Sequence, residues 1–437
     1  MSNSIKLPTI LLSALTALLP MGAATAEVGP PVMQKETILS DSLRFTGDAV
    51  DVLPTGETLR KTAFMRGRQF EWVRKLDHGF ATEERFGKRL DPAPSLDELT
   101  LSELADHLRG VAFFNGHEYI ETKPAYDLAE TVMMYRELER EGASQEKMSA
   151  ILPGISPSQG NADWVPHPQK AESQPRLGTD AQKSVLGSTD DRSVQNNMSY
   201  PHRTHIVFDN TGGSTIDGSQ GSGTLIGPST AMTVAHVFWD EDNDTWEAAH
   251  KWAPGFDSAD RDSSPWGDWA SCYWVTIPGG YTTFESATFD YAVVDFNVGC
   301  NSVKNGVNSD EPGATVGWIG AFVASNSTIE SATGYVRGYP GLGNCGNPSA
   351  SCGVRVWGDV SSSSETDVVT TTIRHGADTS GGQSGSAFYI YDDPSCSGCD
   401  YGPYLVGMHR AGSTNDNRAR VFDSTVNTFM INYSSDF

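Results

Sequence analysis

Positive charge is scarce in this sequence of 437 residues, in which 31 Lys and Arg residues face 55 Asp and Glu residues. The shortage is greatest after residue 183, where 29 acidic residues face only 11 basic ones. A surface of this sign repels phosphate, so we expect no nucleic-acid partner. Hydrophobic residues make up 38% of the chain, which is enough to bury a sizeable core.

Long apolar runs are also lacking after the first 26 residues. Within those 26, Lys6 supplies a positive charge, residues 10–19 form an apolar run, and Ala24-Thr25-Ala26 has the small residues of a cleavage site. We therefore predict a signal peptide over residues 1–26 and a secreted protein, extracellular or periplasmic. No later stretch reaches the roughly 18 apolar residues that a membrane helix needs, so we expect no membrane contact once the signal is removed.

Cysteine is absent before residue 272, and an even number in the remainder of an exported chain predicts disulfides. The six cysteines are Cys272, Cys300, Cys345, Cys352, Cys396 and Cys399. Closeness in sequence favours a bond between Cys345 and Cys352 and leaves Cys272 with Cys300 plausible. The last two have metal-ligand spacing, but no second such pair lies nearby, so we predict no metal site there.

Residues 27–183 differ from the rest in pattern. Leucines near the helical period follow Ser95 and predict a helix that ends before Gly110. An apolar face over residues 126–141, followed by Gly142, predicts a second helix. Pro, Ser, Gly and Gln dominate residues 152–175, which is typical of a linker. We expect mixed, mostly helical material that ends in this linker.

After about residue 200 the pattern favours β-structure, because short runs rich in Val, Thr, Ile and aromatic residues alternate with Gly, Ser, Asn and Asp clusters. Strands are predicted at 204–208, 223–226, 232–235, 291–296, 315–322, 354–357, 368–373, 387–391 and 404–408. Many short strands with glycine-rich turns argue for a sandwich or barrel. A helix is predicted at the end, over residues 424–431.

The strongest local signal for chemistry is the glycine-rich turn of residues 381–386, which presents Ser384. Glycines let a backbone approach a substrate closely and aim N–H groups at a developing oxyanion. Upstream, an apolar run ends in His236, as a general base at a barrel edge requires. Asp290 enters another apolar run, where burial would let its carboxylate orient an imidazolium. Asp295 is the rival, but it lies at the far end of that run.

The order of these residues is His236, Asp290, Ser384. It excludes the α/β-hydrolase arrangement, in which serine comes first. The motifs Thr233-Val234-Ala235-His236, Asp290-Tyr291-Ala292-Val293 and Gly382-Gln383-Ser384-Gly385 resemble the three signatures of the chymotrypsin-like (trypsin fold) serine proteases. The resemblance covers residues 184–437. It implies an all-β domain of two packed six-stranded antiparallel β-barrels with a C-terminal helix and a catalytic cleft between the barrels.

The resemblance also implies roles for these residues. Ser384 is expected to attack the scissile carbonyl, His236 to take and return its proton, and Asp290 to fix the imidazole tautomer. The backbone N–H groups of Gly382 and Ser384 are expected to form the oxyanion hole. No cysteine lies beside His236, which resembles the bacterial branches and differs from animal trypsins.

Two residues point to the kind of bond that is cut. Thr379, five residues before Ser384, and His409, in a Gly-x-His strand, resemble the pocket of the glutamyl endopeptidases, and both side chains can donate to a carboxylate. We therefore expect cleavage after Glu, with Asp as a weaker substrate. Asp378 argues the other way, because trypsins hold the carboxylate that binds Lys or Arg at that position. A bond from Asp378 to backbone would leave the Glu interpretation standing.

The sequence that begins at Ser184 resembles the start of mature glutamyl endopeptidases, which predicts a cut after Lys183. The new α-amino group of Ser184 is then a candidate for binding the substrate carboxylate. Residues 27–183 are interpreted as a propeptide that aids folding or keeps the protease silent. The competing interpretation is an N-terminal binding domain that stays attached.

Residues 240–244 offer alternating oxygen ligands, but they lack the turn glycine of a calcium loop and Lys251 replaces its closing Glu, so no cofactor is expected beyond a possible structural calcium ion. The expected partners are protein or peptide substrates and the chain's own propeptide, and we expect a monomer. A trypsin-fold protein that has lost activity and acts by binding is the remaining alternative.

Overall fold

The computed structural model describes residues 36–53, 55–76, 95–160, 183–184, 186, 192–210, 216, 219–247, 249, 251–257, 264–341, 355–391, 402–412 and 415–437. The predicted signal peptide, most of the predicted linker, and Cys345, Cys352, Cys396 and Cys399 lie outside these ranges. Among the described residues, no helix has both the length and the apolar character needed to cross a membrane.

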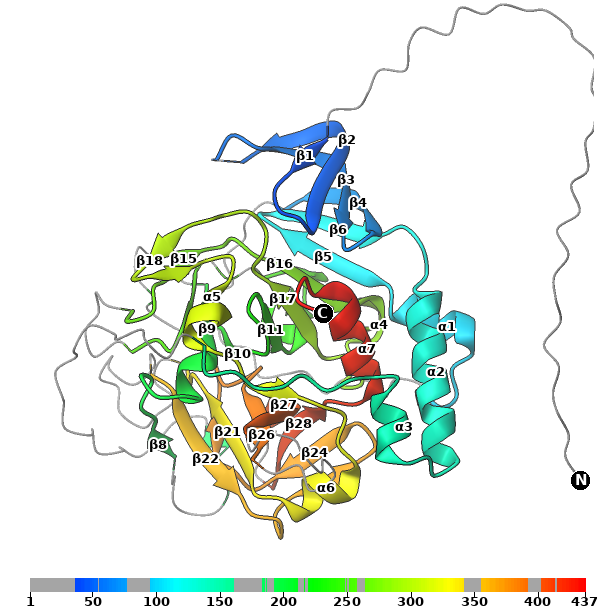
Figure 1. Cartoon of the computed structure of the whole chain (residues 1–437), viewed down its shortest axis with the longest axis vertical. Coiled ribbons are helices and arrows are strands. Elements are labelled where there is room, and N and C mark those ends of the chain that lie inside the picture. The colour runs from blue at the N-terminus through cyan, green and yellow to red at the C-terminus, as the bar shows by residue number, and fades with distance from the viewer. Residues whose placement is uncertain are drawn as a thin grey trace, which may run out of the picture. The chain divides into compact units, whose positions relative to one another are not determined.

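Residues 36–160, here called the N-terminal segment, contain six strands and three helices in their described part (Figure 1). The elements are β1 (Thr37–Ile38), β2 (Leu43–Val52), β3 (Thr58–Met65), β4 (Arg68–Lys75), α1 (Leu101–His107), β5 (Gly110–Phe114), β6 (His117–Glu121), α2 (Tyr126–Arg140) and α3 (Gln145–Ser149). The expectation of mixed structure is confirmed, but the prediction that helices dominate is wrong. The four strands β1–β4, within residues 37–75, were not predicted from the sequence.

Local sequence explains the two longer helices of this segment. The helix predicted to follow Ser95 begins at Leu101, where Thr100 caps α1: its hydroxyl accepts the N–H of Glu103, and the Glu103 carboxylate accepts the N–H of Thr100 at 2.9 Å. The apolar face predicted for residues 126–141 is confirmed as α2, which buries Leu128, Ala129, Val132 and Tyr135.

The first large sheet has thirteen strands in the order β1-β2-β3-β4-β6-β5-β16-β17-β11-β10-β9-β14-β15. Its strands after the N-terminal segment are β9 (His205–Asp209), β10 (Gly221–Leu225), β11 (Thr230–Thr233), β14 (Lys251–Pro254), β15 (Trp269–Ala270), β16 (Trp274–Pro278) and β17 (Ala292–Asp295). Every pairing along this path is antiparallel. The sheet therefore runs without a break from the N-terminal segment into the first half of the predicted protease domain.

The second large sheet has the path β23-β24-β28-β27-β26-β21-β22-β8, and β20 pairs with β27 in parallel. Its strands are β8 (Ser193–Val194), β20 (Gly320–Ala321), β21 (Gly334–Gly338), β22 (Trp357–Ser361), β23 (Asp367–Val369), β24 (Thr372–His375), β26 (Ala387–Ile390), β27 (Tyr404–Gly412) and β28 (Asn417–Val421). The predicted all-β body of curled antiparallel sheets is confirmed (Figure 1). Both sheets have more than six strands in the described residues: the N-terminal segment contributes six of the thirteen in the first, and the second has nine, none of them from that segment.

Short elements fill the connections. The two-stranded pairs are β7 (Lys183–Ser184) with β25 (Thr379–Ser380), β12 (Trp239–Asp240) with β13 (Thr245–Trp246), and β18 (Val303–Lys304) with β19 (Val307–Asn308). The helical turns are η1 (His202–Thr204), η2 (Ala235–Val237), α4 (Gly279–Phe284), α5 (Pro312–Val316) and α6 (Asn326–Ser331). The strand predicted over residues 315–322 is wrong in its first half. Pro312 begins a helix there and Gly317, at φ +85°, ends it, so only β20 remains extended.

The predicted C-terminal helix is confirmed as α7 (Ser424–Tyr433). The Asp423 carboxylate caps it by accepting the N–H groups of Thr425 and Val426 at 3.0 and 3.1 Å. The plausible disulfide between Cys272 and Cys300 is confirmed, with Cα atoms 6.4 Å apart. Cys272 lies shortly before β16 and Cys300 lies in the loop after β17. Both cysteines pack against the largest core cluster.

Candidate active site

His236 and Asp290 meet because their strands pair. β11 and β17 are antiparallel, with Thr233 opposite Ala292, so the residues just after β11 and just before β17 lie at the same end of the pair. There, one carboxylate oxygen of Asp290 lies 2.9 Å from Nδ1 of His236. The other oxygen accepts the backbone N–H of His236 at 3.2 Å. Both contacts hold the imidazole ring in one orientation.

The Asp290 carboxylate and the His236 imidazole each favour the charged form of the other. Burial acts to raise the pKa of Asp290, but the His236 ring and the Arg410 guanidinium overcome it and hold that pKa below its usual range. Burial acts to lower the pKa of His236, and the Asp290 carboxylate outweighs it, so this pKa is raised. The carboxylate is therefore ionised beside a ring that readily accepts a proton.

Asp295, the rival of Asp290, belongs to another part of the molecule. It ends β17 and accepts from the backbone N–H and the hydroxyl of Ser435. Burial raises its pKa to about 7, and nearby Asp436 adds to the shift. Asp295 thus anchors the C-terminal residues and does not face His236.

The turn that carries Ser384 needs its glycines. Gly382 and Gly385 have φ of +85° and +83°, and a Cβ on Gly385 would lie 2.0 Å from the carbonyl oxygen of Ser222. Ser222, in β10, donates its N–H to the carbonyl of Ser384 at 2.7 Å. Within the described residues, the N–H groups of Gly382 and Ser384 make no hydrogen bond. Two adjacent donors are therefore left for a ligand.

The turn lies close to the strand that leads to His236. Gly385 packs against the hydroxyl of Thr233, and that hydroxyl donates to the Ser222 carbonyl at 2.6 Å. Across the described part of the chain, no hydrogen bond joins the Ser384 hydroxyl to the His236 ring. Catalytic hydrogen bonds are often long without substrate and tighten when it binds.

His409 lies beside the same turn. Its carbonyl accepts the N–H of Gly385 at 2.7 Å, and its own N–H donates to Ser386 at 2.8 Å. Its Nδ1 lies 3.3 Å from Nε2 of His375, a buried residue at the end of β24. Burial lowers the pKa of His409 well below its usual value and that of His375 to about 3. The two neutral rings form a pair that sequence reasoning missed, although His375 lies only two residues beyond a predicted strand.

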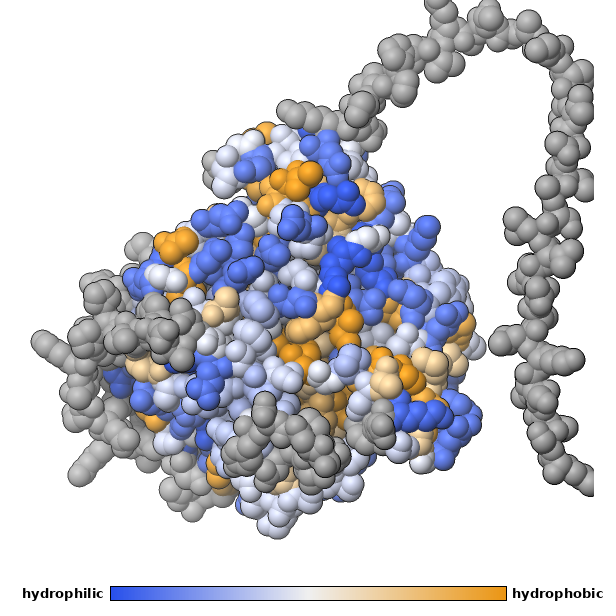
Figure 2. All heavy atoms as spheres, viewed as in Figure 1, coloured by the Kyte–Doolittle hydropathy of each residue, from blue (hydrophilic) through white to orange (hydrophobic). Residues whose placement is uncertain are grey.

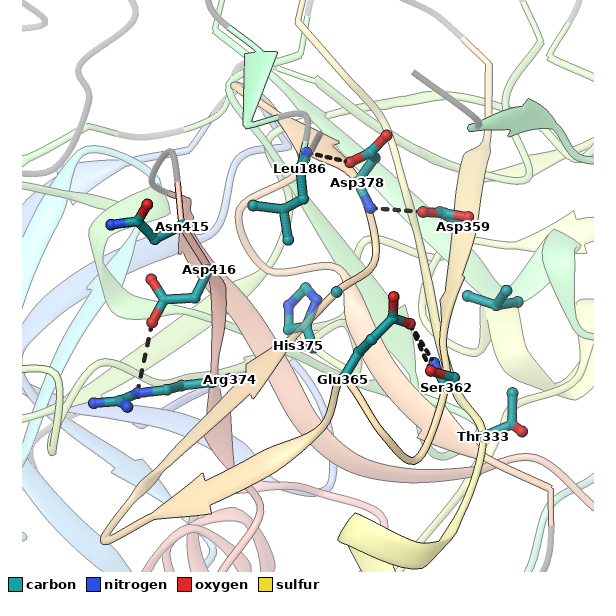
Figure 3. Close-up of a pocket in the computed structure, with 12 residues that line it drawn as sticks. Leu186, Thr333, Asp359, Ser362, Glu365, Arg374, His375, Asp378, Asn415 and Asp416 are labelled. Carbon is teal, nitrogen blue, oxygen red and sulfur yellow. Dashed lines mark hydrogen bonds and ion pairs between the residues drawn. The ribbon is translucent and has the colours of Figure 1, made fainter. Parts of the chain in front are cut away.

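The predicted processing junction lies in β7, which pairs with the short strand β25 that precedes the Ser384 turn. In this pairing, Ser184 is opposite Thr379. The Thr379 hydroxyl is buried and has no partner among the described residues. The Asp378 carboxylate accepts the backbone N–H of Leu186 at 2.7 Å (Figure 3). The condition stated above for the Glu interpretation, a bond from Asp378 to backbone, is therefore met.

Two arginines near the site were not found from sequence. Arg192 is buried and donates to the Ser380 hydroxyl and, at 2.9 Å, to the side-chain oxygen of Gln383. Arg410 follows His409, and its Nε lies 3.1 Å from the Asp290 oxygen that also contacts His236. Only long-range packing brings either side chain to the site. In the sequence, the one indication that Arg410 lies near the site is that it directly follows His409.

Two cavities adjoin these residues. One of about 510 Å³ is lined by Asp378 and His375 together with further acidic side chains (Figure 3). These are Asp359, Glu365 and Asp416. The other, of about 1220 Å³, is lined by His236 and Arg410 and also by residues of the N-terminal segment, among them Tyr135 of α2. We call it the cleft.

The loop proposed for calcium forms a tight hairpin between β12 and β13. One Asp240 oxygen accepts the N–H of Asp242 at 2.8 Å, and the other accepts from the Asn243 side chain. The Glu241 carboxylate accepts a hydrogen bond from the Tyr281 hydroxyl. In the described ranges, no group of three or more His, Cys, Asp or Glu side chains is arranged to hold a metal ion. The calcium site stays a prediction.

No family model matches the sequence, but the chain is similar to a curated protein and to solved structures of proteases. An extracellular metalloprotease of Bacillus subtilis (strain 168) is 24% identical over 250 residues, which span 57% of this chain and 69% of that protein. A solved structure of a Glu endopeptidase in complex with MPD is 23% identical, with a TM-score of 0.42, and the match covers 57% of this chain and 98% of the other. A thermostable serine protease, AL20, from an extremophilic microorganism is 16% identical, with a TM-score of 0.38, over 54% of this chain and 98% of its own. In its curled antiparallel sheets and in the order of its His, Asp and Ser motifs, this chain resembles the chymotrypsin-like serine proteases.

Proposed function

We propose that this protein is a secreted serine endopeptidase that cuts peptide bonds through an acyl-enzyme, preferentially after Glu and more weakly after Asp. The observation that carries the proposal is the 2.9 Å contact between His236 and the fully buried carboxylate of Asp290, at the end of paired strands that adjoin the Ser384 turn. A buried, ionised carboxylate that orients an imidazole is what a serine nucleophile needs from its base.

In the proposed reaction, the Ser384 oxygen attacks the scissile carbonyl carbon while its proton passes to Nε2 of His236. The C–N bond then breaks, and His236 returns the proton to the leaving amine. A water molecule, deprotonated by the same ring, attacks the acyl-enzyme and releases the new carboxylate together with the Ser384 hydroxyl. Asp290 stabilises the imidazolium in both halves without taking its proton.

The proposed oxyanion hole consists of the N–H groups of Gly382 and Ser384. Both lack a partner within the described residues, and the positive φ of Gly382 is a conformation that a side chain would strain. Donors that are already oriented stabilise the oxyanion without reorganisation during the reaction.

Glu specificity is supported by three side chains around the turn. His409 is neutral, and if its Nδ1 accepts from Nε2–H of His375, its single N–H lies on Nε2 and is able to donate to a substrate carboxylate. The buried Thr379 hydroxyl is a second donor without a partner among the described residues. Asp378 is engaged by the Leu186 N–H, which weakens its repulsion of a Glu side chain.

The alternative is trypsin-like specificity for Lys or Arg. It is favoured by the 510 Å³ cavity, which is lined by four carboxylates, one of them that of Asp378. Against it, Asp416 is paired with Arg374 and Arg418, and Glu365 accepts from Ser362, so much of this negative charge is already compensated. An inactive protein that binds peptides is the third possibility.

We further propose that residues 1–26 direct export, that the bond between Lys183 and Ser184 is cut during maturation, and that the enzyme is a monomer acting on proteins and peptides. The proposed cut would free the α-amino group of Ser184 opposite Thr379, beside the proposed Glu pocket.

The test is cleavage-site mapping by mass spectrometry of a mixed peptide library, with the matured protein and with its Ser384→Ala variant. Cuts after Glu that disappear in the variant would support the proposal. Cuts after Lys or Arg that disappear in the same way would retain Ser384 and assign specificity to Asp378. A protein that makes no serine-dependent cut and does not react with a fluorophosphonate would be the inactive binding protein.

A further inference from the structure

We propose that the N-terminal segment, residues 36–160, remains bound in the active enzyme after the cut at Lys183 as a permanent part of the protease fold and one wall of its cleft. The inference rests on the proposed function for that cut. It departs from the expectation that residues 27–183 act only before maturation.

The first support is strand pairing. β5 pairs with β16 over five residue pairs, from Gly110 opposite Pro278 to Phe114 opposite Trp274. On its other side β16 pairs with β17, which follows directly after Asp290. Without β5, β16 would be an edge strand with unpaired N–H and C=O groups one strand away from the catalytic pair.

The second support is a shared core. Trp274 of β16 is fully buried, and Phe70, Phe114 and Tyr119 of the N-terminal segment pack against it with ring centroids 5.3, 6.1 and 5.6 Å away. Residues on both sides belong to one continuous cluster. Loss of the segment would expose this apolar surface to water, which is unfavourable in proportion to its area.

The third support is a set of buried polar contacts with α7. Tyr433 donates to the Leu108 carbonyl at 3.1 Å and also contacts Glu121. Arg68 bonds to the Asn432 side chain of α7 at 3.1 Å and, within the segment, to Glu121 at 2.7 Å, which orients both groups toward α7. Because a buried polar group is costly without its partner, release of the segment would leave unpaired groups on both sides.

The segment also reaches the second half of the molecule and the cleft. Ile155 exchanges two backbone hydrogen bonds with Ala321, at 2.7 and 2.9 Å. Arg136 of α2 donates to the Thr425 hydroxyl at 3.0 Å, and Arg136 and Tyr135 line the cleft together with His236. Figure 2 shows apolar residues near the centre of the face that Figure 1 presents, in the region where Figure 1 draws α7. All these contacts lie within residues 36–160 on the segment's side, so the cut after Lys183 breaks none of them.

The test begins with the full-length precursor, which is allowed to mature or, if it stays intact, is cut by limited digestion with a lysine-specific protease. The product is labelled with a fluorophosphonate, run on size exclusion, and each peak is analysed on a denaturing gel and by mass spectrometry. We expect the fragment that begins at Ser184 to co-elute with the N-terminal fragment at a ratio of one to one. A protease fragment that elutes alone and takes up the label would overturn the inference. Absence of label in every peak would count against the proposed function, while co-elution would still decide whether the segment is retained.

A pair of variants tests the interface itself. Arg68→Ala removes the contact to Asn432 of α7, together with the ion pairs to Glu121 and Asp127 within the segment, whereas Glu71→Ala changes an exposed residue of the same strand β4. We expect the urea concentration at which the two fragments separate to fall for Arg68→Ala and to stay at the wild-type value for Glu71→Ala. Equal midpoints for all three proteins would contradict the assigned interface.

Discussion

Arg410 and His236 contact the same oxygen of Asp290, at 3.1 and 2.9 Å. The Arg410 side chain is largely buried, so water screens its charge weakly. Its cation acts to lower the pKa of His236, and it also helps to keep Asp290 ionised. The base of the proposed reaction is therefore set by two opposite charges, and Arg410 is a positioning residue that acts through Asp290.

This arrangement predicts the pH dependence of an Arg410→Gln variant. Removal of the cation raises the pKa of His236, because the imidazolium loses a repulsive neighbour. Since the ring must be neutral to accept the Ser384 proton, the acid limb of the kcat/KM profile should move to higher pH, by roughly half to one pH unit. Glu241, Asp290 and His409 also interact electrostatically with His236, and these interactions are retained in the variant. Arg418→Gln, on the neighbouring strand β28, is the control, and an acid limb that stays in place or moves to lower pH would contradict the assignment.

Asp290→Asn tests the proposed orienting role. The substitution keeps the shape of the side chain but removes the charge that stabilises the imidazolium, and turnover should fall by about four orders of magnitude. Peptide hydrolysis is the measurement, with Ser384→Ala as the reference for the background rate. Circular dichroism should show that the β-sheet content is retained, and a variant that keeps more than a tenth of wild-type turnover would remove Asp290 from the mechanism.

His375→Gln tests whether the second histidine positions His409. Loss of the ring removes the partner of His409 Nδ1, so His409 should present its N–H to a carboxylate less well. We expect kcat/KM for a substrate with Glu before the cut to fall about 10- to 100-fold, mainly through KM, on the scale of a hydrogen bond to a charged group. Cleavage of a substrate with Leu at that position is the internal control. If both substrates lost activity equally, His375 would have a structural role only.

Asp295 predicts a pH dependence of stability. Its pKa is about 7 in the folded protein, above the usual 3.8 of an aspartate, so the folded state holds the proton more tightly than the unfolded state. Stability should therefore fall as the pH rises from about 4 to about 7. The substituted side chain of the Asp295→Asn variant cannot ionise. The free energy of unfolding of this variant should therefore fall by about 1–3 kcal/mol less than that of the wild type between about pH 4 and about pH 7. Urea unfolding at several pH values measures the slope, and the exposed Asp48→Asn serves as control. Parallel curves for wild type and Asp295→Asn would show that Asp295 does not carry the effect.

Several features could be predicted from sequence because their signals are local. The apolar face of residues 126–141 predicted α2, and the apolar run before His236 predicted β11, to within a few residues. The helix predicted to follow Ser95 begins only at Leu101, because Thr100 makes the capping contacts. The strand predicted over residues 315–322 was wrong in its first half, because Pro312 starts a helix that continues to Val316.

The chain order His236, Asp290, Ser384 and the glycines around the serine were determined by the sequence itself, as were the C-terminal helix and the plausible Cys272–Cys300 bond. Only the tertiary structure decided that β5 completes the edge of β16, that Arg410 shares the Asp290 carboxylate with His236, and that His375 supports His409. The physical reason is sequence separation. Local periodicity and turn chemistry act over a few residues, whereas Gly110 meets Pro278, and Arg410 meets Asp290, only after the sheets have assembled around a shared core.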